Sequence, residues 1–231
     1  MIEKPGRKPV ITIDGPAGAG KSTLAKALAA RLNYTYLDSG ALYRTVALAA
    51  LESKLAVDDE QGLAGLMDRV TIELRTTTQG LKVFLDGRDV SSAIRTEEVG
   101  NAASAISKLG AVRKSLTELQ RRMGAKGGVV LEGRDAGTVV FPDAELKFFL
   151  TASLEERALR RVRQLADQGI EADQGEVRTQ MEARDNQDRN REIAPLRPAE
   201  GAVIVDSTGI AFEDVLKLFV REAVNPTGPD E

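Results

Sequence analysis

Residues 10–23 combine the side chains and the backbone needed to bind a triphosphate. The run fits the pattern Gly-x-x-x-x-Gly-Lys-[Ser/Thr], with the required spacing at Gly15, Gly20, Lys21 and Ser22. Such a loop turns successive backbone N–H groups toward one anion, at a helix start that is already partly positive. Lys21 is expected to reach the β- and γ-phosphates, and the Ser22 hydroxyl to ligate Mg²⁺. The loop therefore predicts nucleoside triphosphate binding.

The elements on both sides of the loop support this interpretation. The loop follows a β-branched strand, Val10–Ile13, and it opens a helix in which Leu24, Leu28 and Leu32 recur at helical spacing. This context distinguishes a phosphate-binding loop from a glycine-rich turn that binds nothing. The loop residues expected to contact ATP are Gly15, Pro16, Ala17, Gly18, Ala19, Gly20, Lys21, Ser22 and Thr23.

The residue types that are missing restrict the chemistry further. The 231-residue chain contains no Cys and no His, which excludes thiol nucleophiles, Ser-His-Asp triads and Cys/His zinc sites. Phosphoryl transfer depends mostly on positioning and charge stabilisation, so it remains available. The net charge is −3, and no run approaches the roughly 18 apolar residues of a membrane span. We expect a cytoplasmic protein that binds neither nucleic acid nor membranes.

The order of the remaining elements predicts an α/β fold. Apolar strands are expected at 34–37, 129–131, 147–150 and 203–206, and helices at about 41–52, 153–168, 174–191 and 212–223. Strands that alternate with helices imply a parallel sheet with right-handed crossovers. We expect a three-layer α/β/α domain over residues 10–231 with a five-stranded parallel sheet. Residues 1–9 are expected to be flexible, and residues 225–231 to form a loose tail.

Residues 70–90 have a different pattern. Val70, Ile72 and Leu74 alternate with polar residues, Val83 and Leu85 do the same, and residues 76–80 separate the two runs. Alternation of this kind indicates a half-buried antiparallel hairpin rather than a buried parallel strand. We expect the hairpin to belong to a small insert at 62–104. Helical spacing returns at Val112, Leu116, Leu119 and Met123.

Two similar tetrads occur at 86–89 (Asp-Gly-Arg-Asp) and 132–135 (Glu-Gly-Arg-Asp). The first ends an alternating strand, where Asp-Gly is ordinary turn chemistry, so both of its aspartates are interpreted as structural. The second follows a continuously apolar strand and is expected at the carboxyl end of the parallel sheet, where ligands bind. We therefore assign function to Glu132, Arg134 and Asp135.

Ser39 and Arg44 lie just after the second expected strand. Ser39 can cap the helix that follows, and Arg44 lies one turn into that helix. A cap and a solvated surface charge would explain both residues without a ligand. Their position after the second strand of a P-loop sheet favours a site for the phosphate acceptor.

Residues 155–163 read Glu-Glu-Arg-Ala-Leu-Arg-Arg-Val-Arg. A charged helix face with a Glu156–Arg160 ion pair would account for this run. However, an enzyme that must exclude water from a γ-phosphate needs a mobile cationic cover. We interpret residues 155–170 as a helical lid.

Arg184, Asp188 and Arg191 are spaced i, i+4 and i+7, which places them on one helix face. A surface ion-pair ladder explains them poorly, because arginine before aspartate is the less favourable order for helix stability. Arginine forks match phosphate oxygens, and an aspartate between them can accept from a sugar hydroxyl. These three residues are therefore candidates for binding the acceptor.

These motifs, in this order, strongly resemble the bacterial-type cytidylate kinases, a branch of the nucleoside monophosphate kinases. The matching stretches are 13–23, 37–44, 94–104, 132–144, 184–191 and 205–208. The loop is shared by many NTPases, whereas the later stretches are specific to this family. The resemblance covers residues 10–223 and implies transfer of the γ-phosphoryl group of ATP·Mg²⁺ to CMP or dCMP, which yields ADP and CDP or dCDP. The hairpin resembles the family's enlarged monophosphate-binding insert.

The resemblance also implies roles for the matched residues. Cytosine would be read by Ser104, Arg113 and Asp135, and the pentose bound by Arg184 and Asp188 with Ser39 nearby. The acceptor phosphate would be held by Arg44, Arg134 and Arg191, while Arg157 and Arg161 would be lid residues near ATP. The expected catalytic residues are Lys21, Arg134, Arg184 and Arg191.

Two of these assignments have direct chemical consequences. The Asp135 carboxylate can accept from the N4 amino group of cytosine but would face the O4 acceptor of uracil, so CMP should be preferred over UMP. Asp14 and Glu132 are the two carboxylates that could orient Mg²⁺ through water, and the sequence does not decide between them.

Other functions remain possible at this stage. The chain could be another small-molecule P-loop kinase, which acts on UMP, shikimate or a nucleoside. It could also be a nucleotide-dependent switch or regulatory ATPase, although the Asn-Lys-x-Asp motif of GTPase switches is missing from the sequence. We expect a monomer whose partners are ATP and CMP or dCMP.

Overall fold

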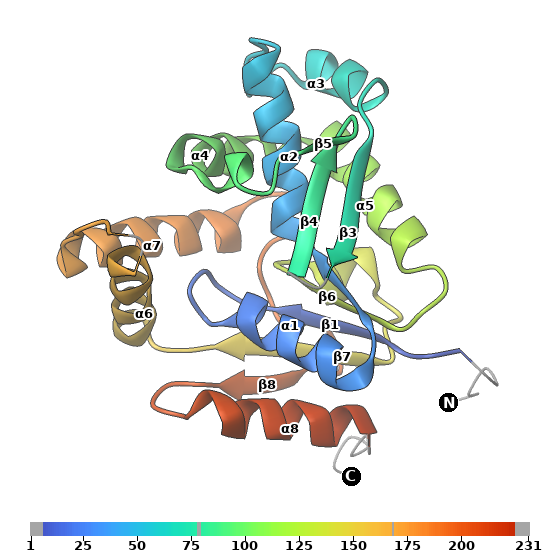
Figure 1. The fold of residues 1–231 in the computed structure, drawn as a ribbon. Coiled ribbons are helices and arrows are strands. Elements are labelled where there is room, and N and C mark those ends of the chain that lie inside the picture. Colours follow the sequence, from blue (N-terminus) through green and yellow to red (C-terminus); the bar gives the residue numbers. More distant parts are fainter. Residues whose placement is uncertain (1–6, 78–79, 168, 225–231) are drawn as a thin grey trace. The chain divides into compact units, whose positions relative to one another are not determined.

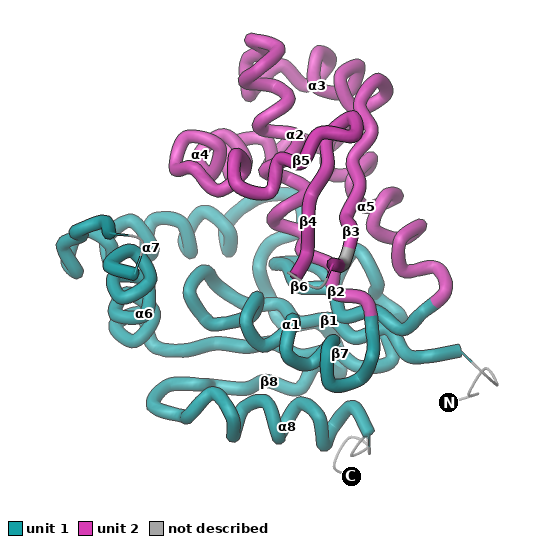
Figure 2. Tube along the Cα trace, in the orientation of Figure 1, with its two compact units in different colours: residues 1–34, 127–231 teal, residues 35–126 magenta. Residues whose placement is uncertain are grey.

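The computed structural model describes residues 7–77, 80–167 and 169–224. The chain forms two compact units, one made of residues 1–34 and 127–231 and the other of residues 35–126 (Figure 2). The expected tail at 225–231 and most of the expected flexible N-terminus lie outside the described residues. At the described end of that N-terminus, the carbonyls of Lys8 and Pro9 accept from the backbone N–H of Gly128.

The chain forms a five-stranded sheet with the strand order β2-β6-β1-β7-β8. Its strands are β1 (Val10–Asp14), β2 (Thr35–Asp38), β6 (Val129–Gly133), β7 (Leu146–Thr151) and β8 (Val203–Asp206). β1 pairs in parallel with both β6 and β7, and every residue of β1 and β6 is buried. Burial from both sides explains why these two strands are continuously apolar. The predicted parallel α/β sheet is confirmed.

β8 differs from the fully buried strand that its sequence predicts. It is the last strand in the sheet and pairs only with β7 among the described strands. Ile204 is 63% exposed, and of the four strand residues only Val205 is buried. An apolar run alone cannot distinguish a central strand from an edge strand, because the difference lies in its neighbours.

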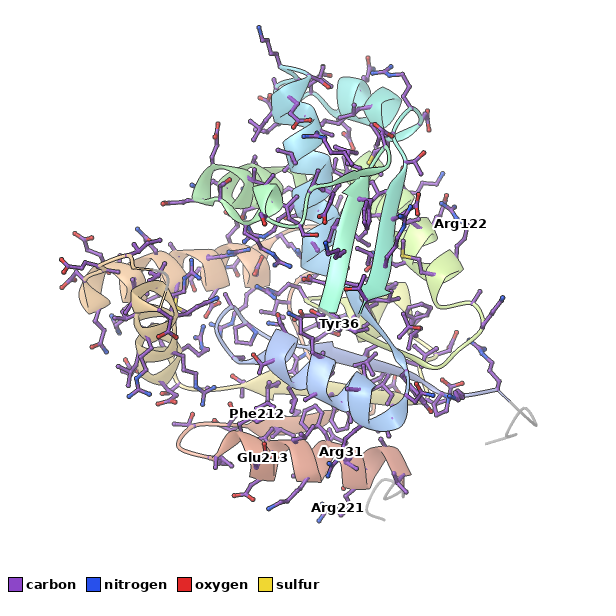
Figure 3. The ribbon with its side chains drawn as sticks, in the orientation of Figure 1. Arg31, Tyr36, Arg122, Phe212, Glu213 and Arg221 are labelled. Carbon is purple, nitrogen blue, oxygen red and sulfur yellow. The ribbon has the colours of Figure 1, made fainter. Side chains whose placement is uncertain are left out.

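β2 belongs to the second unit and the other four strands of this sheet to the first, whose described residues also form four α-helices and one short π-helix. They are α1 (Lys21–Leu32), η2 (Ala136–Val140), α6 (Leu154–Ala166), α7 (Gln174–Asn190) and α8 (Phe212–Val224) (Figure 1). α8 packs its inner face on the sheet through Phe219, whose ring stacks on Phe148 at a centroid distance of 3.8 Å. Phe212 and Glu213 lie at the start of α8 (Figure 3), and Phe212 is 40% exposed. No described helix is long and apolar enough to cross a membrane.

The second unit contains a small antiparallel sheet and its helices. Its elements after β2 are α2 (Ser39–Glu52), α3 (Glu60–Met67), β3 (Ile72–Thr77), β4 (Gly80–Leu85), β5 (Arg88–Asp89), η1 (Ala93–Arg95), α4 (Glu97–Ile106) and α5 (Gly110–Met123). β3 and β4 form the predicted antiparallel hairpin, to which β5 adds a third strand. Residues 78–79, inside the expected turn, lie outside the described residues. α3 and α4 were not predicted, because short helices that contain glycine have weak periodicity.

The first tetrad forms the predicted turn. Asp86 and Gly87 both have positive φ angles, 49° and 80°, and join β4 to β5. The Asp86 carboxylate accepts from the backbone N–H of Thr71, and the Asp89 carboxylate accepts from Ser91. Both aspartates therefore stabilise the hairpin, as Asp-Gly turns commonly do.

Gly15 lies where the chain leaves β1 and passes close to β7. Its φ is +147°, and a Cβ atom there would be only 1.9 Å from the carbonyl oxygen of Leu150. A backbone atom cannot move away as the end of a side chain can, so this position accepts no side chain.

We expect Gly15→Ala to lower the free energy of unfolding by about 3 kcal/mol or more, because the new methyl group overlaps the Leu150 carbonyl. Gly209 is the matched control, because it also has positive φ (+66°) but nothing lies within 4 Å of its Cβ position. Gly209→Ala should cost only about 1–2 kcal/mol of backbone strain. Urea unfolding of both variants measures the difference, and equal costs would contradict the close approach.

Candidate functional site

The loop between β1 and α1 places Lys21 at the start of a helix. Gly20 precedes α1 with a left-handed φ of 93°, and the Lys21 ammonium donates to the Pro16 carbonyl at 2.7 Å. The Lys21 side chain is buried, and burial together with the positive charge of Arg134 lowers its pKa from 10.5 to about 7. Glu132, Asp14 and Asp188 favour the charged form of Lys21, and a bound phosphate would add further negative charge that favours it.

Asp14 holds the backbone that follows the second tetrad. Its two carboxylate oxygens accept from the N–H groups of Ala136 (2.8 Å) and Gly137 (2.7 Å), at the start of η2. Burial raises the Asp14 pKa from 3.8 to about 6, and these two hydrogen bonds oppose the rise. Asp14 therefore ties the end of β1 to the chain that leaves β6.

The oxygen ligands near the loop are compatible with a nucleotide-bound Mg²⁺. The described residues contain no group of three or more acidic side chains that could hold a metal ion alone. Mg²⁺ commonly takes one or two protein oxygens together with phosphates and water. The exposed Ser22 hydroxyl at the start of α1 is an oxygen ligand of this kind, and the buried Asp14 and Glu132 carboxylates lie at the ends of the paired strands β1 and β6.

Two acidic–basic pairs connect the second tetrad to the end of α7. Arg134 Nε donates to Asp188 Oδ2 at 2.8 Å, and Arg191 Nη2 donates to Asp135 Oδ1 at 3.4 Å. Asp135, Asp188 and Arg191 have little exposed side-chain surface, between 6% and 8%. The structure thus brings together four residues that the sequence assigned to the acceptor.

Arg191 reaches this cluster by a different route from the one predicted. α7 ends at Asn190, and Arg191 has extended backbone angles (φ −64°, ψ 140°). Its Nε donates to the Ala194 carbonyl, and the Leu196 N–H bonds back to Asp188. The i, i+4, i+7 spacing therefore does not place Arg191 on the face of α7, because a turn after the helix orients its side chain. Arg184 lies within α7 and is half-buried.

Arg157, predicted to be a lid residue, is buried beneath the loop. Its Nε donates to Ala152 O (3.0 Å), its Nη1 donates to Ala17 O (3.0 Å), and its Nη2 pairs with Asp185 Oδ2 at 2.7 Å. The side chains of Arg157 and Asp185 are each only 4% exposed. Arg157 therefore joins α6 and α7 to the backbone of the phosphate-binding loop.

Arg160 is a loop contact that sequence reasoning missed. Its Nη1 lies 3.4 Å from Ala19 O and 3.1 Å from Ser207 Oγ, and its Nη2 donates to Ser207 O. Its Nε forms the expected i,i+4 pair with Glu156 at 2.9 Å. The predicted pair with Glu156 already explained why an arginine occurs at position 160. The sequence therefore contained no separate signal for the contacts of Arg160 with Ala19 and Ser207. Arg161 is exposed and donates to Gln164.

The second unit has its own group of predicted residues around the start of α2. Asp38, not Ser39, caps this helix, because its carboxylate accepts from the Ala41 N–H at 2.8 Å. Ser39 is instead the first helical residue and is buried. Asp38 also pairs with Arg95 at 3.2 Å. The expected cap was one residue too late, since either side chain can accept the same N–H.

Arg44, Ser104 and Arg113 lie on three helices of this unit. Arg44 of α2 donates from Nη1 to Ile94 O at 3.2 Å. Arg113 of α5 is buried, donates to Ser107 O at 3.0 Å and lies over the Tyr43 ring, with Cζ 5.7 Å from the ring centroid. Ser104 of α4 is half-buried, and its carbonyl accepts from the Ser107 hydroxyl. These arginines are held in place by carbonyl and ring contacts rather than left to move in solvent.

The phosphate-binding loop on a parallel α/β sheet defines this chain as a P-loop nucleotide-binding protein. A sequence model of the cytidylate kinase family matches residues 11–225. The chain is 51% identical over 212 residues to a cytidylate kinase of Geobacter sp. (strain M21), covering 92% of this chain and 91% of that protein. The chain therefore belongs to the cytidylate kinase family.

A second relative agrees with this membership, and a solved structure bears on the fold. A cytidylate kinase of Aeromonas hydrophila is 49% identical over 224 residues, with 97% of each chain covered. Among solved structures, an uncharacterized protein from Eubacterium ventriosum matches with a TM-score of 0.54 and 12% identity, covering 94% of this chain and 99% of that one. At this identity, the structural likeness supports the fold alone.

We expect Asp185→Ala to lower the free energy of unfolding by about 3–5 kcal/mol, because it leaves the buried Arg157 guanidinium without its charge partner. Glu182→Ala in the same helix is the control, because Glu182 forms an exposed pair with Arg178 at 3.8 Å that should contribute less than about 1 kcal/mol. The double variant Arg157→Met/Asp185→Leu should recover much of the loss. Chemical denaturation measures all three, and similar values for Asp185→Ala and Glu182→Ala would refute the assignment.

Proposed function

We propose that this chain is an ATP-dependent kinase that transfers the γ-phosphoryl group of ATP to CMP or dCMP, producing ADP and CDP or dCDP. The observation that carries the proposal is the phosphate-binding loop with its buried Lys21, in a chain that belongs to the cytidylate kinase family. A buried ammonium beside a glycine-rich loop favours a polyanionic ligand. The ammonium attracts negative charge, and the backbone N–H groups of the loop can donate hydrogen bonds to the same anion.

On the ATP side, we propose that the loop residues 15–23 surround the phosphates and that Lys21 stabilises charge on the transferred group. Ser22 would hold Mg²⁺, with Asp14 or Glu132 orienting it through water. When bound, Mg²⁺ would neutralise charge on the phosphate oxygens. Arg161 is assigned to the lid over ATP, and Arg157 serves the same site through its bond to Ala17 O.

On the acceptor side, we propose that the residues assigned to the acceptor from the sequence bind CMP. They are Ser39, Arg44, Ser104, Arg113, Arg134, Asp135, Arg184, Asp188 and Arg191. The arginine–aspartate pairs of this set support the proposal, because they orient the guanidinium groups before a phosphate binds. Arg134, Arg184 and Arg191 would then stabilise the charge that moves between the two nucleotides.

The proposed reaction needs no general base from the protein. An oxygen of the CMP phosphate forms a bond to the γ-phosphorus of ATP, and the bond from that phosphorus to the β,γ-bridging oxygen breaks, so that its electron pair stays on ADP. The acceptor phosphate is already largely dianionic near neutral pH, since its second pKa is about 6. This matches a chain without His or Cys.

The proposal takes the chain to act as a monomer with small-molecule partners. A net charge of −3 gives no general attraction to nucleic acid.

An acceptor panel tests the proposed reaction. With ATP·Mg²⁺ as donor, release of ADP should rise strongly with CMP or dCMP, weakly with UMP, and not with shikimate or cytidine. Lys21→Ala should lose most of this turnover, because the moving charge loses its cation. ATP hydrolysis that no acceptor stimulates would contradict the kinase assignment and favour a switch or regulatory ATPase.

We expect Asp135→Ala to lower kcat/KM for CMP and to reduce the preference for CMP over UMP. A carboxylate that accepts from the cytosine amino group discriminates against uracil, by factors of up to about 10⁴–10⁵ in favourable sites. Steady-state kinetics with both acceptors measure the ratio. An unchanged kcat/KM together with an unchanged CMP:UMP ratio would remove Asp135 from cytosine recognition.

A further inference from the structure

Gly100 is a glycine in the middle of a helix. α4 runs from Glu97 to Ile106, and Gly100 is buried within it. Its backbone is helical, so no unusual φ angle requires a glycine there. Inside a helix, glycine is less favourable than alanine because it loses more conformational freedom on folding. The reason for the missing side chain must therefore lie in what surrounds it.

The guanidinium of Arg44 occupies the space that a side chain at Gly100 would need. A Cβ atom built at Gly100 would lie 3.0 Å from Nη1, 3.3 Å from Nη2 and 3.5 Å from Cζ of Arg44. Outside α4 itself, these are the three nearest atoms. Arg44 reaches this point from α2, and its Nη1 donates to Ile94 O just before α4. The planar end of Arg44 thus lies directly against the backbone of α4 at Gly100.

We propose that Gly100 is a positioning residue that sets where the Arg44 guanidinium lies and thereby the affinity for the acceptor phosphate. The inference rests on the proposed function, in which Arg44 binds the phosphate of CMP. A methyl group at Gly100 has to move Nη1 away by a few tenths of an ångström. A guanidinium that binds phosphate through two parallel hydrogen bonds depends on its orientation, so this shift weakens binding.

The same geometry explains why Gly100→Ala should weaken binding of CMP without lowering the stability of the fold. The atoms that must move are the far end of a flexible side chain, not backbone or packed core. Alanine also favours the helix more than glycine does. A glycine needed only for close packing of α2 on α4 would instead make its substitution costly for stability.

The test compares Gly100→Ala with Gly65→Ala. Gly65 also lies within a helix of the same unit, α3, but its Cβ position is in ordinary contact, with the nearest atom 3.6 Å away at Arg69 Nη1. We expect Gly100→Ala to raise KM for CMP about threefold to tenfold, leave KM for ATP unchanged and leave the unfolding midpoint unchanged or higher. Gly65→Ala should change neither KM. A Gly100→Ala enzyme with an unchanged KM for CMP, or one with a lower unfolding midpoint and equal changes in both KM values, overturns the inference.

A double-mutant cycle with Arg44→Ala shows whether Gly100 acts through Arg44. If it does, Gly100→Ala has no further effect on the KM for CMP once the guanidinium is gone. Additive effects of the two substitutions would overturn the inference. The cycle also separates the two levels of the argument. If Arg44→Ala itself leaves the KM for CMP unchanged, the proposed role of Arg44 fails. If only Gly100→Ala leaves it unchanged, the role of Arg44 stands and the positioning inference fails.

Discussion

The burial of charged side chains is the constraint on which the first unit depends. Lys21, Asp14 and Glu132 are all at most 5% exposed, and they lie at the ends of β1 and β6 or at the start of α1. A buried charge is costly unless it is paired or hydrogen-bonded. Asp14 meets this requirement with two backbone N–H groups. Lys21 donates to one carbonyl, and the attraction of Glu132, Asp14 and Asp188 does not prevent burial and Arg134 from lowering its pKa to about 7. Lys21 is thus the residue of the three whose charged form a bound anion would stabilise.

α7 supplies aspartates that pair with buried or half-buried arginines of the first unit. Asp185 pairs with Arg157 beneath the loop, and Asp188, about one turn later, pairs with Arg134 after β6. One helix therefore helps to hold both the backbone that would surround the donor phosphates and an arginine assigned to the acceptor. This accounts for a helix rich in charge whose aspartates are buried, a pattern that surface ion pairs alone would not explain.

The sequence predicted the parts of the fold that follow from local rules. The phosphate-binding loop, the buried strands β1 and β6 and the antiparallel hairpin all have signals that span a few residues. The interior pairings were not predictable in this way. Arg157 and Arg160 belong to one charged helix and look alike in sequence, yet the buried Arg157 contacts Ala17 and Asp185, while Arg160 contacts Ser207. Their environments depend on elements that are distant in the chain.

Glycine shows most clearly why local rules fall short. The P-loop pattern requires Gly15, but the pattern does not reveal that the Leu150 carbonyl fills the space beside it. At Gly100 the sequence predicts neither the helix nor a reason for glycine, since the reason is a side chain from another helix. At Gly15 a backbone atom excludes a methyl group, so a substitution there destabilises the fold. At Gly100 the end of a long side chain excludes it, so the helix can tolerate alanine while the Arg44 guanidinium has to shift. A glycine can therefore be required for ligand binding without being required for folding.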